Sequence, residues 1–303
     1  CFFMTLKGLA EEFLFHCECR RLSQRTVKNY KKQIQYLLDY LRETYDITEL
    51  EQVKPTHIKH FLMTKQRAGR KPAYINDLLK AYKCLFKYAY EEEYTSELLT
   101  KRIQNVKQPK TIIRAFNNEE IKNMLKYWRG NDYISIRNRT ILAILFDTGL
   151  RLNELINLTQ DSIKSDYFVI LGKGEKERVV PKTAYVGKLL SQYLRVRESY
   201  FMNRNLAPNL FLSRYGKPLC SSAIEHMLKN TGEAVGVRQE VRISPHTCRH
   251  TFAQIQLMNG LDIYSLSRVL GHEHIYTTQT YLEGLQDSKI LKESSKASPL
   301  MNL

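Results

Sequence analysis

Residues 244–253 read SPHTCRHTFA, and this stretch predicts both a helix and part of a reactive site. Ser244 followed by Pro245 is a typical helix start, because a serine hydroxyl caps free backbone amides and proline fits the first turn. His246 and Arg249 follow three residues apart, so they are expected on one side of that helix. An imidazole beside a guanidinium can bind an anion, so the helix is expected to carry anion-directed side chains.

Three other stretches carry polar residues in comparable settings. TGLRLNEL spans 148–155, LGKGEKERVVP spans 171–181 and LGHEHIYTTQTYL spans 270–282. Taken singly, each has an ordinary explanation, such as a surface ion pair, a hairpin tip or a packing tyrosine. Taken together with the first stretch, they favour one catalytic site. Its candidate residues are Arg151, Lys173, His246, Arg249, His272 and Tyr281.

These side-chain types suit attack on a phosphodiester. Arginines and a histidine can neutralise the charge that develops on nonbridging oxygens. A lysine on a hairpin can protonate the leaving oxygen, and a histidine can take the proton of a tyrosine, whose ordinary pKa is about 10. A covalent phosphotyrosine would conserve the energy of the broken bond. We therefore expect no metal, no ATP and no other cofactor.

The charge balance predicts a polyanionic partner. Lys and Arg outnumber Asp and Glu by 47 to 31, which gives a net charge of +16 and a pI near 9.5. Residues 1–110 hold 21 basic and 13 acidic side chains, so both parts of the chain are basic to the same degree. Basic surfaces release counterions when they neutralise phosphates, so we favour nucleic acid over a merely solubilising charge.

The apolar residues and cysteines indicate a cytoplasmic protein. No run of about 18 apolar residues is present that would span a membrane. The opening CFFMTLKGLA lacks the basic leader and small-residue cleavage site of a secretory signal. The six cysteines form no disulfide pattern and no paired Cys-x-x-Cys motif.

Residues 5–100 predict four amphipathic helices around one core, because apolar residues recur there at helical spacing in four runs. We therefore expect a helical domain over 1–103, followed by a weakly periodic, proline-bearing linker over 104–116. The expected core residues are Leu6, Leu9, Phe13 and Cys17, then Val27, Tyr30, Ile34, Leu37 and Leu41, then Ile58, Phe61 and Leu62, and finally Ile75, Leu78, Tyr82, Leu85 and Ala89.

The second half also predicts helices, with one small β element. Tyr167–Leu171 and Arg178–Val180 are β-rich runs separated by Gly-Lys-Gly-Glu-Lys, which is typical of a hairpin. Ser222 and Glu225 predict a capping box for a later helix. The expected fold is mainly α, with an α-rich domain and small hairpin over 117–284 and a tail over 285–303.

The four quoted stretches resemble the motif boxes of the tyrosine recombinase (integrase) family, which includes the Xer proteins and many phage and transposon integrases. TGLRLNEL is similar to the first arginine box, with Glu154 as the acidic companion, and LGKGEKERVVP is similar to the hairpin with the catalytic lysine. SPHTCRHTFA resembles the His-x-x-Arg box, with Cys248 where the family often has leucine. LGHEHIYTTQTYL resembles the last box, whose tyrosine follows the histidine by nine residues.

The resemblance implies a two-domain, Xer-like site-specific recombinase. The stretch LSQRTVKNYKKQIQYLLDYL, over 22–41, resembles the family's SAM-like core-binding domain more loosely. Tyr281 would attack the scissile phosphate to give a 3′-phosphotyrosyl link and a free 5′-hydroxyl. The two arginines and His272 would stabilise the transition state. Lys173 would protonate the leaving oxygen, and His246 would assist proton transfer at the tyrosine.

The resemblance also implies partners. They are double-stranded DNA with an inverted-repeat core site and three further copies of the chain, in a tetramer built as a dimer of dimers on that DNA. An accessory protein is a further candidate, and the place of action would be the nucleoid of a prokaryotic cell. The tail over 285–303 is expected to dock on a neighbouring protomer, with a disordered end as the alternative. Candidate phosphate contacts, with a solvated surface as the alternative, are Arg25, Lys28, Lys31, Lys32, Arg70 and Lys71.

Two other classes of function remain open from the residues. A type IB topoisomerase uses the same tyrosine chemistry but relaxes a single duplex, and supercoil relaxation without strand exchange would favour it. A noncatalytic DNA-binding protein would need no nucleophile at Tyr281. The sequence contains no carboxylate cluster that suits a metal-dependent nuclease.

Overall fold

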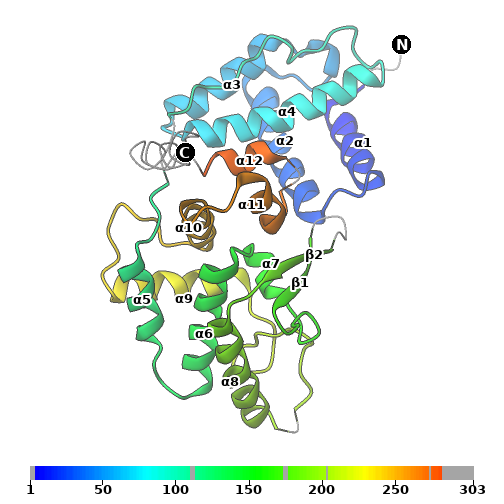
Figure 1. Ribbon diagram of the computed structural model, residues 1–303. Helices are drawn as coiled ribbons and strands as arrows, with labels where there is room; N and C mark the ends of the chain where they lie inside the picture. Colours follow the sequence, from blue (N-terminus) through cyan, green and yellow to red (C-terminus); the bar gives the residue numbers. More distant parts are fainter. Residues whose placement is uncertain (1–3, 110–112, 173–176, 203, 273, 282–303) are drawn as a thin grey trace, which may run out of the picture. The chain divides into compact units, whose positions relative to one another are not determined.

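The protein consists of two compact units, residues Cys1–Lys110 and Thr111–Leu303. The computed structural model describes residues 4–109, 113–172, 177–202, 204–272 and 274–281. Figure 1 shows that both units are built mainly of helices. This confirms the predicted mainly α fold with a small hairpin. The division falls inside the stretch predicted as a linker, whose bounds stay a prediction.

The first unit contains four α-helices, and each begins after a capping side chain or at a proline. Thr5 caps the first helix by accepting from the Gly8 amide at 3.0 Å, and Ser23 caps the second by accepting from the Thr26 amide at 3.2 Å. The other two begin with a proline. The elements are α1 (Leu6–Cys19), α2 (Gln24–Tyr45), the 3-10 turn η1 (Leu50–Gln52), α3 (Pro55–Arg67) and α4 (Pro72–Glu91).

The core of the first unit is formed by the predicted apolar stripes. Nearly all of their members are buried, and only Val27 and Tyr30, near the start of α2, are half-buried. Tyr82 is the largest fully buried side chain of this core, and its hydroxyl donates to the Gln33 carbonyl at 3.0 Å. The buried polar group is therefore satisfied, as burial requires.

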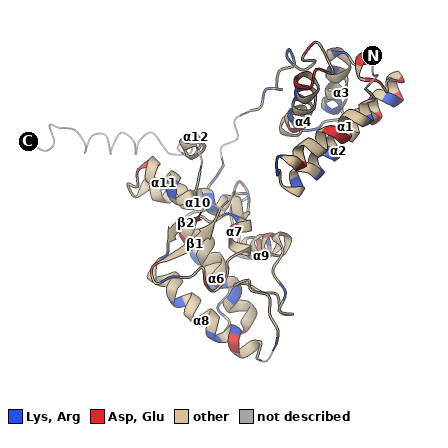
Figure 2. Cartoon of the chain, turned by 90° about the vertical axis from the view of Figure 1, so that its right-hand side faces the viewer, with Lys and Arg blue, Asp and Glu red and all other residues tan. Residues whose placement is uncertain are grey.

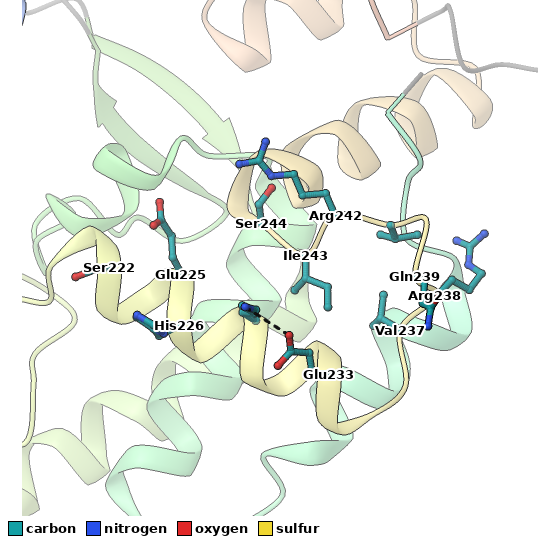
Figure 3. A pocket seen from close by; sticks show the side chains of 12 residues that line it. Ser222, Glu225, His226, Glu233, Val237, Arg238, Gln239, Arg242, Ile243 and Ser244 are labelled. Atoms are coloured by element: carbon teal, nitrogen blue, oxygen red, sulfur yellow. Dashed lines mark ion pairs between the residues drawn. The ribbon is translucent and has the colours of Figure 1, made fainter. Parts of the chain in front are cut away.

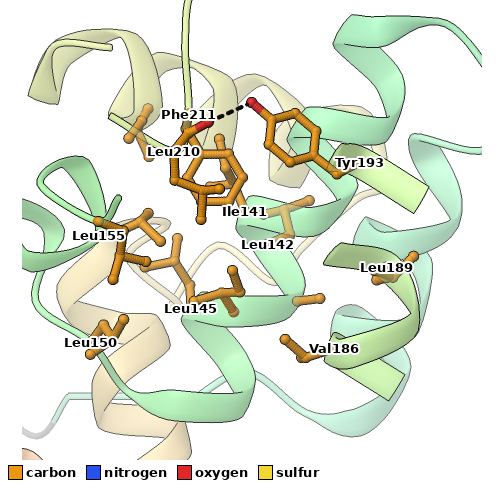
Figure 4. Packing of buried hydrophobic residues seen from close by; sticks show 14 of the residues in the cluster. Ile141, Leu142, Leu145, Leu150, Leu155, Val186, Leu189, Tyr193, Leu210 and Phe211 are labelled. Atoms are coloured by element: carbon orange, nitrogen blue, oxygen red, sulfur yellow. Dashed lines mark hydrogen bonds between the residues drawn. The ribbon is translucent and has the colours of Figure 1, made fainter. Parts of the chain in front are cut away.

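The second unit surrounds one almost entirely buried helix, α6, which packs against α8 and α10. Every residue of α6 is buried or half-buried, so this helix lies in the core. Figure 4 shows Ile141, Leu142 and Leu145 in one buried cluster with Tyr193, whose hydroxyl donates to the Leu210 carbonyl at 2.9 Å. The helices are α5 (Asn118–Tyr127), α6 (Tyr133–Thr148), α7 (Leu152–Ile156), α8 (Ala184–Tyr200), α9 (Ser221–Ala234), α10 (Pro245–Met258), α11 (Ile263–Leu270) and α12 (Ile275–Gln279).

The predicted hairpin is present as two antiparallel strands, β1 (Tyr167–Leu171) and β2 (Glu177–Pro181). The register pairs Val169 with Val179, and β2 extends one residue further at each end than the predicted run. β2 also contacts α11, so the hairpin lies against the helix that precedes the last motif. Within the ranges that the structure describes, no helix is both long enough and apolar enough to cross a membrane.

The helix starts of the second unit agree with the sequence in one case and differ in another. Ser244 caps α10 by accepting from the Thr247 amide at 3.2 Å, as predicted. The predicted capping box of Ser222 and Glu225 is wrong. Helix α9 begins at Ser221 with Cys220 as its N-cap, and the Ser222 hydroxyl contacts the Cys220 sulfur at 3.2 Å instead of capping an amide.

Candidate active site

Arg249 is the buried centre of the candidate site. It lies in the second turn of α10 and is 5% exposed. Its Nη1 donates to the Gly149 carbonyl at 2.7 Å, and its Nη2 donates to the Leu270 carbonyl at 2.8 Å. Gly149 and Leu270 stand at the C-terminal ends of α6 and α11, where carbonyls lack helical partners. One guanidinium therefore fixes the ends of two helices relative to α10.

Gly149 permits this close assembly. It caps α6 with φ of +60°, a left-handed conformation that glycine adopts without strain. A Cβ at this position would stand 2.4 Å from the Phe252 ring on α10. The glycine in TGLR is therefore required by backbone conformation and by packing, and it brings the following arginine next to Arg249.

Arg151 is held at the edge of the same cluster with much of its side chain accessible. It is the N-cap of α7, its backbone amide donates to Glu154 Oε2 at 2.7 Å, and its Nη1 donates to Glu154 Oε1 at 2.9 Å. Its Nη2 donates to the Gly271 carbonyl at 3.1 Å. The Arg151 side chain is 43% exposed while that of Glu154 is 8% exposed. A buried carboxylate thus orients a guanidinium that still faces solvent.

Glu154 remains ionised in this setting. Burial raises the pKa of its carboxyl, but hydrogen bonds from Arg178 and Arg151 outweigh burial and hold the pKa below its ordinary value. Arg178 contributes two of these bonds, each 2.8 Å long. The carboxylate therefore stays a permanent acceptor for the arginines around it.

His272 follows Gly271, the C-cap of α11. The His272 ring bonds Arg249, and the preceding Gly271 carbonyl accepts from Arg151. Arg249 Nη2 lies 2.8 Å from His272 Nε2, and because a guanidinium can only donate, Nε2 accepts. The proton of the neutral ring is then on Nδ1, which lies 2.8 Å from the Thr278 hydroxyl. Burial and then the positive charges of Arg249 and Arg151 lower the pKa of His272 to about 4. His272 is therefore neutral near pH 7.

Tyr281 packs beside His272 in the same chain. The two rings are stacked, with centroids 6.0 Å apart and planes 18° apart. The Tyr281 side chain is buried, its ring lies 5.2 Å from that of His250, and its carbonyl accepts from Gln254 Nε2 at 3.3 Å. Tyr276, the other tyrosine of this segment, is 76% exposed. The geometry brings Tyr281, and not Tyr276, to the histidine.

The remaining two candidate catalytic residues are His246 and Lys173. His246 is exposed at the start of α10, unlike the buried Arg249 on the following turn. Local desolvation and then the charges of Arg249 and Arg242 lower the pKa of His246, so the ring is available as a neutral base. Lys173 lies outside the described residues.

The candidate phosphate contacts of the first unit all lie at its surface. Arg25, Lys28, Lys31 and Lys32 are exposed on the first turns of α2. At 100° per residue their side chains cover an arc of about 120° on one side of the helix. The remaining two are exposed at the connection between α3 and α4, where Arg70 lies in the loop and Lys71 is the N-cap of α4.

A separate hollow of about 660 Å³ lies between α9 and the segment 237–244 (Figure 3). Glu225, His226 and Glu233 line it from α9, and Lys229 forms an ion pair with Glu233 at 3.7 Å. The hollow reaches Ser244 at the start of α10, but its lining includes none of the six candidate catalytic residues. This hollow is therefore separate from the candidate catalytic residues.

Sequence reasoning missed several groups that hold this cluster together. The Gly149 and Leu270 carbonyls are backbone atoms, so the type of residue at these positions does not indicate their role. Thr278 could have been suspected only from its spacing of six residues after His272. Arg178 left one signal, since strand alternation places it on the same side of β2 as the buried Val180.

The buried His250 and the half-buried His272 predict an acid-sensitive fold. Burial lowers the pKa of His250 to about 4, as it does for His272. A histidine whose folded pKa is depressed stabilises the fold above its unfolded pKa of 6.5, and this contribution is lost as pH falls from 6.5 towards 4. Each histidine should cost at most about 1.4 kcal/mol per pH unit in that window. We expect Tm to fall across it, and to fall less in His272→Gln; equal slopes for both proteins would contradict the assignment.

The amino-acid sequence is similar to known proteins in both units of the chain. Residues 114–287 match the phage integrase family, and residues 11–93 match the phage integrase N-terminal SAM-like domain. The tyrosine recombinase XerD of Halalkalibacterium halodurans is 28% identical over 280 residues, which cover 91% of this chain and 93% of that protein. The tyrosine recombinase XerD of Staphylococcus aureus is 28% identical over 297 residues, which cover 97% of this chain and 99% of that protein.

Solved structures show the same fold. The XerH recombinase in a post-cleavage complex with a palindromic difH substrate superposes with a TM-score of 0.75 at 22% identity, over 95% of this chain and 84% of that one. A lambda integrase dimer bound to a core site gives a TM-score of 0.73 at 15% identity, over 93% of this chain and 78% of that one.

Proposed function

We propose that this chain, which belongs to the phage integrase family, cleaves and rejoins duplex DNA through a 3′-phosphotyrosyl link formed by Tyr281. Membership of this family makes it a tyrosine-type, site-specific DNA recombinase. The observation that supports the residue assignment best is the convergence of Arg249, Arg151, His272 and Tyr281 at the C-terminal end of α11. All four come from one chain, so the nucleophile is placed to attack a phosphate held by its own arginines.

The two arginines are suited to bind the scissile phosphate. Arg151 is half-exposed and presents its guanidinium to solvent. Arg249 is desolvated, and burial lowers its pKa while interaction with Tyr281 opposes that effect. A fixed, dehydrated guanidinium stabilises developing negative charge more than a hydrated one. We assign both to the nonbridging oxygens of the pentavalent transition state.

His272 is assigned to stabilise the same transition state. One of its hydrogen bonds in the DNA-free protein would then have to change when DNA binds. Its Nε2 accepts from Arg249 in the DNA-free protein. A phosphate that binds Arg249 would release Nε2 from this bond, and its negative charge would favour the protonated ring. Thr278 keeps the opposite edge of the ring in place. His272 would then donate to the phosphate while remaining stacked beside Tyr281.

Proton transfer is assigned to His246 and Lys173. His246 is exposed with a lowered pKa, so a neutral ring is available to take the Tyr281 proton at neutral pH. Lys173, between the two strands of the hairpin in sequence, would protonate the 5′ leaving oxygen. The incoming 5′-hydroxyl of a partner strand reverses the same steps, so neither a metal nor ATP enters the reaction.

The assembly is proposed as a tetramer, a dimer of dimers, on double-stranded DNA with an inverted-repeat core site. Proteins of the same fold were solved with DNA, including a XerH complex with a palindromic substrate and a lambda integrase dimer on a core site. Lys and Arg are distributed over the helices of both units (Figure 2), as binding along a polyanion needs. The proposed tail contact, over 285–303, lies outside the described residues. An accessory protein and action at the prokaryotic nucleoid, in the cytoplasm, complete the proposal.

The basic start of α2 gives a testable prediction about DNA affinity. Replacing Lys28 and Lys31 with alanine should weaken DNA binding about tenfold at 0.1 M salt and reduce the slope of log K against log salt by about 2, because two phosphate contacts are lost. A matched control removes Lys7 and Lys87, which already pair with Glu11 and Glu91. Equal effects of both double variants in a fluorescence anisotropy titration would refute a specific role for α2.

Strand exchange separates the proposal from relaxation of a single duplex. The purified protein, incubated without metal on two DNA molecules that carry the site, should yield molecules joined across the sites. Relaxed plasmid without joined products would instead indicate a topoisomerase-like activity. Binding to the site without either product would indicate an accessory DNA-binding protein.

A further inference from the structure

The Arg178 side chain on β2 points toward the interior of the second unit although it carries a positive charge. On β2, Val179 is 56% exposed, while the Arg178 side chain is only 13% exposed and lies on the side of the buried Val180. A β-branched residue outside and an arginine inside reverse the usual alternation of an exposed hairpin. An arginine that is nearly buried has to be paired, so its partners show what it does.

The partners of Arg178 are two elements of the candidate active site. Its Nη1 and Nη2 donate to the two oxygens of Glu154, each at 2.8 Å, in a bidentate fork. Its Nε donates to the Val269 carbonyl at 3.0 Å, in the last turn of α11. The same Glu154 carboxylate holds Arg151 through its side chain and its backbone amide. Arg178 therefore contacts Glu154, which anchors Arg151, and the helix α11, which ends two residues before His272.

Gly271 shows how closely the arginine is fitted to the turn before His272. Gly271 has φ of +65°, and its carbonyl accepts from Arg151 Nη2. A Cβ on Gly271 would stand 2.8 Å from Arg178 Cδ and 2.9 Å from its Nε. The turn is thus in direct contact with the Arg178 side chain on one side and bonded to Arg151 on the other. Movement of the Arg178 side chain would therefore displace both the Gly271 turn and the Arg151 guanidinium.

We propose that Arg178 is a positioning residue for DNA strand cleavage, which fixes the Arg151 guanidinium and the Gly271–His272 turn relative to each other through Glu154 and the end of α11. This inference rests on the proposed catalytic roles of Arg151 and His272. Arg178 also belongs to β2, so it ties the hairpin to these two groups. The planar guanidinium is needed because only it supplies two parallel donors to the carboxylate and a third donor to a carbonyl.

The chain offers a matched control for this arrangement. Arg238 forms the same kind of contact elsewhere in the second unit: its Nε and Nη2 donate to the two oxygens of Glu120, at 2.8 and 3.1 Å, and its Nη2 also donates to the Ala115 carbonyl at 2.8 Å. The Glu120 side chain is 9% exposed, close to the 8% of the Glu154 side chain. Arg238→Lys and Arg178→Lys therefore remove the same kind of fork, although the Arg238 side chain is 41% exposed and that of Arg178 is 13% exposed. Only the Arg178 fork holds a candidate catalytic residue.

The first experiment compares both lysine variants with the natural protein on a nicked suicide DNA, by single-turnover formation of the covalent adduct. Arg178→Lys should reduce the maximal cleavage rate on the order of 10–100-fold, because small misplacements of reacting groups have effects of this size. The DNA concentration for half-maximal rate should stay within about twofold. Arg238→Lys should lower Tm by less, because its ion pair is more exposed, and should leave the rate unchanged. Equal rates for Arg178→Lys and the natural protein would overturn the proposal, as would equal losses in both variants.

Two further measurements separate positioning from general damage. In Arg178→Ala, added guanidinium ion at tens of millimolar should restore part of the rate, whereas sodium at equal ionic strength should not. Nitrogen-15 spectra of the arginine side chains, without DNA, should show Arg151 signals altered in Arg178→Lys and unaltered in Arg238→Lys. If the natural protein formed no adduct, the proposed function would fail. The spectra would still decide the positioning of Arg151, and unaltered Arg151 signals in Arg178→Lys would overturn it.

Discussion

Replacing Tyr281 with phenylalanine is expected to abolish DNA cleavage while leaving DNA binding nearly intact. The change removes one hydroxyl, which is the proposed nucleophile, and keeps the ring that stacks on His272 and packs beside His250. No other group in the site can form the same phosphotyrosyl link, so the loss should be on the order of 10⁴-fold or more. Covalent adduct formation on suicide DNA, followed by denaturing gel electrophoresis, measures it.

The control for this prediction is Tyr276→Phe, because Tyr276 belongs to the same segment and is 76% exposed. Its cleavage rate should equal that of the natural protein. Affinity for the recombination site should change by less than about threefold in both variants, since neither hydroxyl is proposed to read DNA. Cleavage by Tyr281→Phe at the natural rate would remove the residue from the mechanism.

Arg249→Lys is expected to give the second-largest effect, a loss of cleavage on the order of 10²–10³-fold. Lysine keeps the charge but cannot donate at once to the Gly149 and Leu270 carbonyls and to the ring of His272. Each buried carbonyl left unpaired costs about 1–3 kcal/mol, so Tm should fall as well. Single-turnover cleavage and a thermal melt of the same sample measure both effects.

Arg137→Lys separates the chemical effect from the loss of stability. Arg137 is another buried arginine of the second unit, and it donates to the Leu212 carbonyl and to Asn138, away from the candidate site. Its lysine variant should lose stability to a similar degree, but any folded fraction should cleave at the natural rate. A similar loss of cleavage in both variants would mean that Arg249 acts only through the fold.

The sequence predicted the helical architecture because each helix carries its own signals. Ser23 and Ser244 cap the helices that follow them, and the apolar stripes of α1 to α4 are almost all buried. These features are local, since capping and helical periodicity depend on residues within a few positions. The prediction failed at Ser222, where a capping pattern was present but Cys220 became the N-cap. Spacing alone cannot show which of two nearby residues, Cys220 or Ser222, becomes the N-cap.

The candidate site could be predicted as a set of residues but not as an arrangement. Motif order indicated Arg151, Arg249 and His272, yet the groups that join them are distant in sequence or belong to the backbone. Arg249 bonds a carbonyl 100 residues away, and the bond from Arg178 to Val269 spans 91 residues. Such contacts depend on how α6, α10, α11 and β2 come together. The neutral state of His272 follows from the same convergence of arginines, which no local pattern contains.

The measurement that tests the central claim most directly is the identity of the residue joined to DNA. The protein is incubated, with a chelator and no added metal, with suicide DNA nicked beside the cleavage position, and the adduct is digested and analysed by mass spectrometry. We expect a nucleotide attached through a 3′-phosphate to Tyr281. Attachment at Tyr276 or another residue, or the absence of any adduct on DNA that the protein binds specifically and that contains the true site, would contradict the account.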